Sequence, residues 1–546
     1  MPAGIHLTQS GVDQLRCQNT TVLFTLKKRI RITGVDKFIF GRAQFEGSII
    51  FERTNNTTKV NPCNELSRDR TMTTNTEDLR SYLKDVETRH ELLTITKAVD
   101  VEDEVPALCS ETKVPTLFEN LKGYDGWRLA DCLLRDRIQH GIALKCPPEA
   151  VIGHYASLTA RGPGKTVLVD DSPAKEVVWT GEEIDLSKLP VPIPSEGIDV
   201  PHLSLTPEDF ATPVISGSVA VTRNPETGLQ NCFFTMAKVD SARRAHCYVF
   251  SPHTWENIRA YDARGERCPI ALVIGCHPIY ELAAAYTGPH PGFSEIQLAA
   301  GMLGETVAVT NCRSVELQVP AYAELVIEGL IDPEVGRYVT TAAHTDTHAP
   351  FLSNEPYFDV TAITMRADPI YRHIQPTRFT DHHSICEFIT APMLLNILRG
   401  KGLNVHDVAV PLHSALNCAV IQMTANAREE VREALLNGMT MPFFPRLTIA
   451  VDDDVNIYDM NDIIYAMSIR VDPKVDIMTV KDIRSFNLEP IAAPIAGMEE
   501  TILRSGSRYA IDATKPPLSQ PDKRIQFERL TARGEGRVFL KDFTGK

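Results

Sequence analysis

The sequence lacks several features that would assign it to large classes of protein. No run approaches about 18 consecutive apolar residues, so no transmembrane helix is expected, and the N-terminus has no charged-then-apolar leader of the secretory kind. Basic residues are not in excess: the formal net charge is −14, which argues against nucleic acid or an anionic membrane as a general partner. No P-loop is present and no GxGxxG motif opens a helix after a strand, which disfavours ATP-binding and NAD-binding enzymes.

Paired cysteines are also lacking, because the twelve cysteines include no CxxC pair. Scattered thiols such as Cys132, Cys232, Cys276 and Cys418 are typical of reduced, mostly buried residues in a cytoplasmic protein, not of a disulfide framework or a zinc site. A hydrophobic content of 43% and a charged content of 23% are ordinary for a globular protein. The 546 residues are enough for two or three domains.

The first 71 residues differ from the rest of the chain. They contain 11 Lys and Arg against 6 Asp and Glu, and they are rich in Thr, Asn and Arg without a clear hydrophobic period. A helix is predicted next, with Asn75 or Thr76 as its N-cap and an apolar face that begins at Leu79. We therefore interpret residues 1–71 as a flexible extension or a mis-called start, and residues 72–200 as the first domain.

The patterns that follow change twice along the chain. From Ile215 short β-branched runs are joined by turns, and Pro225 and Gly228 supply the fixed and the permissive φ of a tight hairpin. From about residue 378 strands and helices alternate, including an amphipathic helix closed by Gly438. The predicted fold class is α+β, with an α/β region, an antiparallel β domain and a second α/β domain over residues 72–200, 201–377 and 378–546.

Three candidate metal ligands lie beside turns in the stretch that ends at Glu295. Asn231 follows the turn of the predicted hairpin, His253 follows a Pro-containing loop, and Glu295 opens a helix with Ser294 as its N-cap. An amide oxygen, an imidazole and a carboxylate suit an ion such as Mn²⁺ or Fe²⁺ and leave positions open for a ligand phosphate. Taken singly, the same residues also fit a turn Asn, a surface His and a helix-start Glu.

These motifs resemble those of the UbiD family of prenylated-FMN-dependent decarboxylases. The sequence TRNPETG at residues 222–228 is similar to the family's TRDPETG-like turn, and the Asn, the His and the Glu follow it in the family's order. The resemblance runs from about residue 72 to the C-terminus. It implies that Asn231, His253 and Glu295 hold a divalent metal that bridges to the flavin phosphate, and that residues 201–377 form a split β-barrel that carries the flavin.

The same resemblance implies a set of cofactors and partners. The cofactor is prenylated FMN, supplied by a prenyl-flavin synthase, with Mn²⁺ or Fe²⁺ at its phosphate and K⁺ as an optional further ion. The family's C-terminal domain, here residues 378–546, forms the oligomer contact, so a homodimer or homohexamer is expected. The chemistry itself also calls for a cofactor, because decarboxylation leaves an electron pair on carbon that no side chain can accept.

Two places that carry catalytic residues in most of the family are altered here. Most members have an Arg five residues after the metal-binding Asn, where this chain has Met236, with Lys238 two residues further on. The family's ExPFGE/D-like segment reads THAPFLSNEP, which puts His348 and Ser353 where the two acids would stand. The usual network of one Arg and two acids is therefore absent from its expected positions.

Two functions fit this altered pattern. In the first, the protein is a decarboxylase, or a reversible carboxylase, of an aromatic or unsaturated acid or its CoA thioester, such as phthaloyl-CoA. His348 would then donate the proton, and Lys238 or Ser353 would hold the substrate, while Asp346 and Glu355 are out of register. In the second, the protein is a non-catalytic flavin-binding subunit of a multi-subunit carboxylase. The retained metal ligands favour the first function.

Other polar residues receive structural interpretations. Glu324 and Glu328 lie four residues apart near the edge of the predicted barrel, and their spacing favours a structural pair over a catalytic one. Asp381, His382 and His383 precede a predicted helix, where such residues more often cap and pack than catalyse.

Overall fold

The computed structural model divides into two compact units, Met1–Arg70 and Thr71–Lys546. The residues that it describes are 14–17, 20–23, 38–40, 43–45 and 74–544, except 198, 200, 202–203, 250, 289–291, 340–351, 377–378, 415, 442–444, 487–488, 490 and 496–502.

The first unit contains four described strands that the sequence analysis did not predict. They pair in one sheet in the order β2-β1-β3-β4. That residues 1–71 are a flexible extension or a mis-called start stays a prediction. The four strands are β1 (Gln14–Cys17), β2 (Thr20–Leu23), β3 (Phe38–Phe40) and β4 (Ala43–Phe45).

The second unit begins with a region of helices and short strands, and its first helix is α1 (Leu79–Arg89). The predicted apolar face of α1 is buried, but its N-cap is Asp78, which forms a capping box with Ser81. The prediction of Asn75 or Thr76 as the cap is wrong, because Asn75 belongs to strand β5 (Thr74–Asn75), which pairs with β15 (Thr306–Asn311). The region continues with β6 (Leu93–Ile95), α2 (Glu104–Glu111), β7 (Thr116–Phe118), β8 (Arg128–Asp131), α3 (Arg137–Leu144), α4 (Val151–Thr159), β9 (Thr166–Leu168) and β10 (Val177–Thr180).

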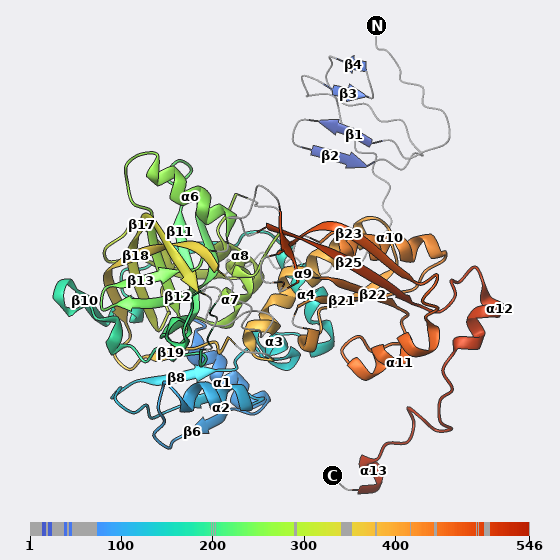
Figure 1. Ribbon diagram of the computed structural model, residues 1–546, viewed down its shortest axis with the longest axis horizontal. Coiled ribbons are helices and arrows are strands. Elements are labelled where there is room, and N and C mark those ends of the chain that lie inside the picture. The colour runs from blue at the N-terminus through green and yellow to red at the C-terminus, as the bar shows by residue number, and fades with distance from the viewer. Residues whose placement is uncertain are drawn as a thin grey trace, which may run out of the picture. The chain divides into compact units, whose positions relative to one another are not determined.

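A closed β-barrel follows, drawn mainly in green and yellow in Figure 1. Six strands pair in the order β18-β13-β12-β11-β14-β17, and β17 pairs back with β18, so the barrel has no free edge. This confirms the antiparallel β domain that the turn-linked runs predicted. The barrel strands are β11 (Val214–Arg223), β12 (Gln230–Ser241), β13 (Arg244–Cys247), β14 (Pro269–Ile274), β17 (Leu325–Val339) and β18 (Leu352–Met365).

Helices and a small sheet cover the outside of this barrel. Helix α8 packs against β12 and β9, and α7 packs against β11 and β12. Strand β15 pairs with β5, β9 and β16 in a separate sheet. The covering elements are α5 (Pro207–Phe210), α6 (Pro252–Asp262), α7 (Pro278–Ala284), α8 (Glu295–Leu303), β15 (Thr306–Asn311), β16 (Gln318–Pro320) and β19 (Ile370–Arg372).

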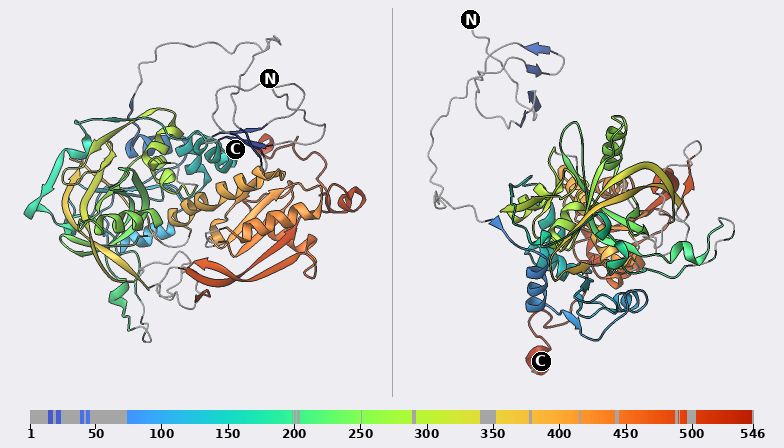
Figure 2. Two further views of the ribbon diagram at one scale, coloured as in Figure 1. Left: turned by 90° about the horizontal axis from the view of Figure 1, so that it is seen from above. Right: turned by 90° about the vertical axis from the view of Figure 1, so that its left-hand side faces the viewer.

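The last region is a second α/β sheet in the order β20-β21-β22-β25-β23. Helix α9 contacts α4 and α7 as well as β20 and α10, so it joins this sheet to the rest of the unit (Figure 2). The strands are parallel along β21-β22-β25 and antiparallel at both ends. Its main elements are α9 (Asp381–Gly400), β20 (Val405–Ala409), β21 (Cys418–Met423), α10 (Arg428–Met439), β22 (Leu447–Val451), α11 (Met460–Arg470), β23 (Ile477–Phe486) and β25 (Leu503–Ala513).

Gly438 does not close its helix, as the sequence analysis predicted, but lies within α10. A Cβ atom at this position would come within 2.5 Å of Thr448 on β22. Glycine is therefore used for close packing of helix on sheet rather than for a left-handed C-cap.

Two broader expectations are consistent with the structure. The described cysteines form no disulfide and most are buried, as the absence of CxxC pairs predicted. Within the part of the chain that the structure describes, no helix is long and apolar enough to cross a membrane.

Candidate active site

The hairpin between β11 and β12 fixes the start of the strand that carries Asn231. The side chain of Asn224 accepts the N–H groups of Glu226 and Thr227 at 2.9 and 3.0 Å, and Gly228 takes φ +71°. Asn224 thus mimics a backbone turn, and glycine supplies the positive φ at no steric cost. The turn sets the register in which Asn231 pairs with Thr222 on β11.

Asn231 links strand β12 to the first turn of α6, the helix that contains His253. Its amide nitrogen donates to Ser251 Oγ at 3.3 Å and to Thr254 Oγ1 at 3.1 Å. Ser251 is the N-cap of α6, and its hydroxyl also accepts the N–H of Thr254. His253, between these two partners of Asn231, is exposed, and its Nδ1 lies 3.3 Å from Glu256.

Glu295 approaches the same strand from the start of α8. Ser294 caps this helix in a capping box with Gln297, as predicted for the cap. One carboxylate oxygen of Glu295 accepts the main-chain N–H of Cys232 at 2.6 Å, directly next to Asn231 in the chain. The three predicted metal ligands therefore gather around the first residues of β12.

The electrostatics of Glu295 are those of a carboxylate that lacks a counter-ion. The residue is only partly exposed, and burial raises the pKa of its carboxyl to about 7, against the opposing effects of the Cys232 N–H and thiol and of His253. Among the described residues, no Lys or Arg forms an ion pair with it.

A divalent cation fits this donor set. Both hydrogen bonds that the Asn231 side chain makes to described residues use its nitrogen, which leaves the amide oxygen for a ligand. No three His, Cys, Asp or Glu side chains of the described chain lie close enough to share a metal. A cation here therefore needs the amide oxygen beside the carboxylate and the imidazole, a mixture that suits Mn²⁺ or Fe²⁺.

Met236, Lys238 and Ser353 lie further along the barrel. Met236 is buried, and its carbonyl accepts the hydroxyl of Tyr338 at 3.2 Å. Tyr338 is also the partner of Ser353 in the register of β17 and β18. His348, the other residue predicted for catalysis, lies outside the described residues, as does Asp346.

Lys238 is tied to the main chain of two other elements. Its Nζ donates to the carbonyls of Asp209 at 2.7 Å and Val339 at 3.2 Å. Burial lowers the pKa of its amine to about 8. These bonds occupy two of the three donors of the ammonium group, so one remains for a substrate.

Glu355 is the residue that the sequence analysis set aside and the structure brings forward. Glu355 is 2% exposed, and its carboxylate accepts the N–H of Val249 at 2.9 Å. Burial raises its pKa to about 7, against the opposing effects of the Val249 N–H and of the nearby Ser353 hydroxyl. The signal was present in the sequence, because residues two apart in a strand share a face, so Glu355 follows Ser353 on one face.

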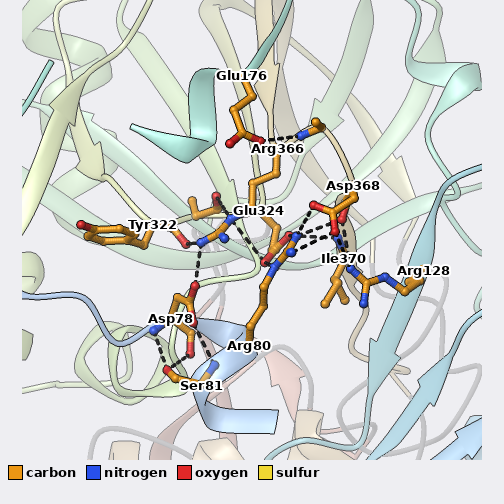
Figure 3. Close-up of polar contacts among 12 residues, drawn as sticks. Asp78, Arg80, Ser81, Arg128, Glu176, Tyr322, Glu324, Arg366, Asp368 and Ile370 are labelled. Carbon is orange, nitrogen blue, oxygen red and sulfur yellow. Dashed lines mark hydrogen bonds and ion pairs between the residues drawn. The ribbon is translucent and has the colours of Figure 1, made fainter. Parts of the chain in front are cut away.

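A second group of polar residues is structural, as predicted for Glu324. Figure 3 shows Arg80 directed at Glu324 and Asp368, with Arg366 on the other side of the carboxylate. Arg80 Nε and Nη2 donate to the two oxygens of Glu324 at 2.8 and 2.9 Å, and the N–H of Ile370 adds a third bond at 3.0 Å. Arg366 also pairs with Asp78, the cap of α1, at 2.7 Å. This network ties α1 to the barrel.

Glu328 and Asp381 are also engaged in structural contacts. Glu328 accepts the N–H groups of Arg313 and Ser314 at 2.7 and 2.6 Å. Asp381, at the start of α9, pairs with the fully buried Arg372 at 2.5 Å. Arg372 also donates twice to Glu281, both times at 3.1 Å. The charges of Arg372, Glu281 and Asp381 are thus matched within the chain, whereas Glu328 is held by main-chain N–H groups.

A cavity of about 720 Å³ opens beside the start of β12. Gln230, Ser294 and Gln297 are among the residues that line it, each next to or near a predicted metal ligand. None of Met236, Lys238 and Ser353 lines it, so it is separate from the face on which we expect the substrate.

Sequence models of three domains from one protein family match this chain in order. They are described as the N-terminal, the Rift-related and the C-terminal domain of 3-octaprenyl-4-hydroxybenzoate carboxy-lyase, and they match residues 83–159, 165–379 and 383–513. Together they cover well over half of the 546 residues.

Solved structures have the same architecture. The UbiD-class enzyme HmfF from Pelotomaculum thermopropionicum, in complex with FMN, is 28% identical, with 86% of this chain and 100% of that chain covered and a TM-score of 0.76. The 3,4-dihydroxybenzoic acid decarboxylase of Klebsiella pneumoniae is 20% identical, with 86% and 99% covered and a TM-score of 0.73. The open form of vanillic acid decarboxylase from Sedimentibacter hydroxybenzoicus is 19% identical, with 84% and 97% covered and a TM-score of 0.69. At their lower identity, the last two establish a common fold alone.

Proposed function

The chain belongs to the UbiD family of carboxy-lyases, and from this premise we propose that it decarboxylates an aromatic or unsaturated carboxylic acid or its CoA thioester. A phthaloyl-CoA-like thioester is the substrate class that we favour. An electron-withdrawing thioester lessens the need for the Arg and the acids that are absent from their usual positions. The reaction is reversible in principle, so the chain can also act as a carboxylase.

Prenylated FMN is the proposed cofactor, and a similar enzyme at 27% identity has been solved in complex with it. When bound, it supplies the electron sink that decarboxylation needs. We propose that Asn231, His253 and Glu295 hold Mn²⁺ or Fe²⁺ at its phosphate, with K⁺ as an optional further ion. A prenyl-flavin synthase would supply the cofactor, and a homodimer or homohexamer would be the working assembly.

The observation that carries this proposal is the unmatched carboxylate of Glu295. Its one main-chain hydrogen bond, from Cys232, lies next to Asn231, and burial raises its pKa to about 7. A carboxylate in such surroundings gains most from a cation that comes from outside the chain. The amide of Asn231 and the imidazole of His253 supply further ligand atoms of the right type.

We assign separate tasks in this proposal to Met236, Lys238, Ser353 and His348. The buried Met236 gives the substrate an uncharged wall where most relatives have an Arg. Lys238 has one donor left for a substrate carboxylate or carbonyl. Ser353 lies on the face beside Tyr338, and His348 stays a candidate proton donor.

The test is an assay of CO₂ release. The chain would be expressed with a prenyl-flavin synthase and offered aromatic acids and their CoA thioesters, with protein made without the synthase as the control. We expect release from a thioester that depends on the synthase. The absence of turnover from every substrate would contradict the proposal.

The second function, a flavin-binding accessory subunit, is favoured by the loss of the Arg and both acids from their usual places. It predicts that the chain binds flavin and metal but releases no CO₂ alone. Activity that appears only when other polypeptides are added would support it.

A further inference from the structure

We propose that Glu355 is the source of the proton that replaces CO₂ on the product, and that the hydroxyl of Ser353 passes this proton on. The inference rests on the proposed function and adds a residue that lies outside the positions where the family carries its acids. Its basis is the placement of Glu355 on the face that also holds Met236, Lys238 and Ser353.

The register of the barrel strands places Ser353 and Glu355 on one face of β18. Ser353 pairs with Tyr338 and Glu355 with Gly336 in the ladder of β17 and β18. Because side chains alternate along a strand, Ser353 and Glu355 project to one side and Asn354 to the other. The exposure agrees, since Asn354 is exposed and Glu355 is buried. Ser353, which stands at an altered acid position, therefore shares its strand face with the carboxyl of Glu355 two residues away.

A chain of contacts also links Glu355 to strand β12. The Tyr338 hydroxyl donates to the carbonyl of Met236 at 3.2 Å, and the Tyr338 ring stacks on Tyr248 at 5.8 Å. Tyr248 precedes Val249, whose N–H donates to Glu355 at 2.9 Å. Glu355 is thus connected to the position of the missing Arg through Tyr338 and Tyr248.

The surroundings of the Glu355 carboxyl favour its protonated form. No Lys or Arg of the described chain pairs with the Glu355 carboxyl, and burial raises its pKa to about 7. A carboxylic acid that keeps its proton near neutral pH can donate it, whereas an exposed Glu cannot. The titratable or polar side chains that face Glu355 from the neighbouring strands are Lys238, His246, Cys247, Tyr248, Tyr338, Ser353 and Tyr357.

Three nearby titratable side chains are less suited to give this proton. His246 is held between the rings of Tyr338 and Tyr357, and its Nε2 lies 3.0 Å from the carbonyl of Glu355. Burial lowers the pKa of His246, which disfavours its protonated form. Burial raises the pKa of Tyr248 and Tyr338 well above their ordinary value.

The proton transfer balances as follows. The carbon–carbon bond to the substrate carboxylate breaks, CO₂ leaves, and the electron pair of that bond stays on the carbon. That carbon takes the proton of the Ser353 hydroxyl while Ser353 takes the proton of Glu355. Glu355 is left ionised, and a proton from solvent restores it. In the carboxylation direction the same two groups remove the proton.

A structural role is the main alternative, because Glu355 also anchors the loop that leads from Val249 to the start of α6. Glu355→Gln separates the two, since an amide oxygen still accepts the N–H of Val249 but cannot give a proton. The matched control is Glu334→Gln, which makes the same change at an exposed position of the neighbouring strand β17.

The first measurement needs no cofactor and no turnover. Infrared difference spectra of the flavin-free chain between pH 6 and pH 9 report protonated carboxyl groups that ionise in this range. We expect one carbonyl band of the wild type to be lost in Glu355→Gln and kept in Glu334→Gln. If the two variants and the wild type give the same bands, Glu355 does not titrate between pH 6 and pH 9 and the inference is wrong.

The second measurement uses the enzyme loaded with its flavin. We expect Glu355→Gln to lower kcat by about 100-fold or more with KM within about 3-fold, the range for loss of a general acid. Glu355→Asp should recover part of the rate, and Ser353→Ala should also lower kcat. Turnover of Glu355→Gln within about 3-fold of the wild type, with unchanged flavin and metal content, would assign Glu355 a structural role only.

The pH profile decides the matter if Glu355→Gln does not fold. The wild-type kcat should fall as pH rises above about 7, because the acid form is the one required. A kcat that stays flat from pH 6 to pH 9 would overturn the inference. If the loaded wild type releases no CO₂ from any substrate, the proposed function fails instead, and the infrared titration still tests the protonation of Glu355.

Discussion

Glu324 and Glu295 both lie against the outside of the barrel, and their surroundings differ in one respect. Glu324 is fully buried and receives two arginines, Arg80 at 2.8 Å and Arg366 at 3.5 Å. Glu295 receives a main-chain N–H and a thiol from Cys232. At Glu324 the chain itself supplies the cations. At Glu295 no Lys or Arg of the described residues does so, and the carboxylate is available to an ion from outside.

The same difference separates Arg372 and its partners from Glu355. Arg372 is fully buried and donates to Glu281 and Asp381, which come from α7 and α9. Glu355, equally deep, has hydrogen bonds but no described cation. Burial without a cation raises the pKa of Glu355, so its carboxyl can hold a proton for use in chemistry.

Removal of Arg372, whose charge is balanced by Glu281 and Asp381, should have the largest effect on stability. Arg372→Met leaves Glu281 and Asp381 without their common partner in surroundings that water does not reach. We expect a loss of about 3–5 kcal/mol in the free energy of unfolding, measured by urea denaturation. Arg223→Met, which removes an exposed pair with Glu316, should cost less than about 1 kcal/mol. Equal losses for the two variants would remove the contrast between matched and unmatched regions.

Removing the unmatched carboxylate should affect metal rather than stability. We expect Glu295→Gln to weaken Mn²⁺ binding by more than about 100-fold, since losing even a residue that orients a ligand costs about 10–100-fold. Titration calorimetry of the flavin-free chain and metal analysis of the loaded enzyme measure this. Glu324→Gln should lower the melting temperature but leave the metal content unchanged. If Glu295→Gln bound Mn²⁺ as tightly as the wild type, Glu295 would not be a ligand.

Much of this contrast could be predicted from the sequence, but only where local pattern decides the structure. The hairpin at Pro225 and Gly228 and the Ser294 cap of α8 depend on neighbouring residues, and they are found as predicted. Gly438 and the N-cap of α1 depend on what a distant strand does, on β22 and β15 respectively. Those predictions were wrong because sequence alone does not give the partner.

The candidate site was predictable to a similar extent. The resemblance supplied Asn231, His253 and Glu295. The alignment of THAPFLSNEP with the family's ExPFGE/D-like segment, however, put Ser353 and not Glu355 at an acid position. Strand alternation would have placed Glu355 on the face of Ser353, but its lack of a cation is a property of the folded chain. The partners of Arg372 come from residues 281 and 381, about 90 and 9 positions away, and no spacing rule joins them.

A change of pH should act on Glu355 through stability as well as rate. Its pKa is raised from 4.5 to about 7 in the folded chain. Below pH 4.5 both folded and unfolded chains hold this proton. Between pH 4.5 and about 7 the folded chain binds more protons, so the stability contributed by Glu355 is lost as pH rises.

We expect the free energy of unfolding of the wild type, relative to Glu355→Gln, to fall by about 2 kcal/mol between pH 5 and pH 8. The reason is that each pH unit between the two pKa values contributes about 1.4 kcal/mol at most. Urea denaturation at the two pH values measures it, with Glu334→Gln as the control. A difference that does not change with pH would show that Glu355 ionises normally and has a counter-charge after all.

The smallest expected effect concerns Lys238, which lies two residues after Met236 on strand β12. Its Nζ is bound to the carbonyls of Asp209 and Val339, so Lys238→Met leaves both without a donor. We expect a loss of about 1–2 kcal/mol in stability and a rise of less than about 3-fold in KM for a substrate thioester. Lys188→Met, at an exposed lysine near Asp185, is the control for a lost surface charge. A rise in KM of about 10-fold or more without loss of stability would mean that Lys238 mainly holds the substrate. The third donor of the ammonium group would then matter more for function than its two bonds to main-chain carbonyls do for stability.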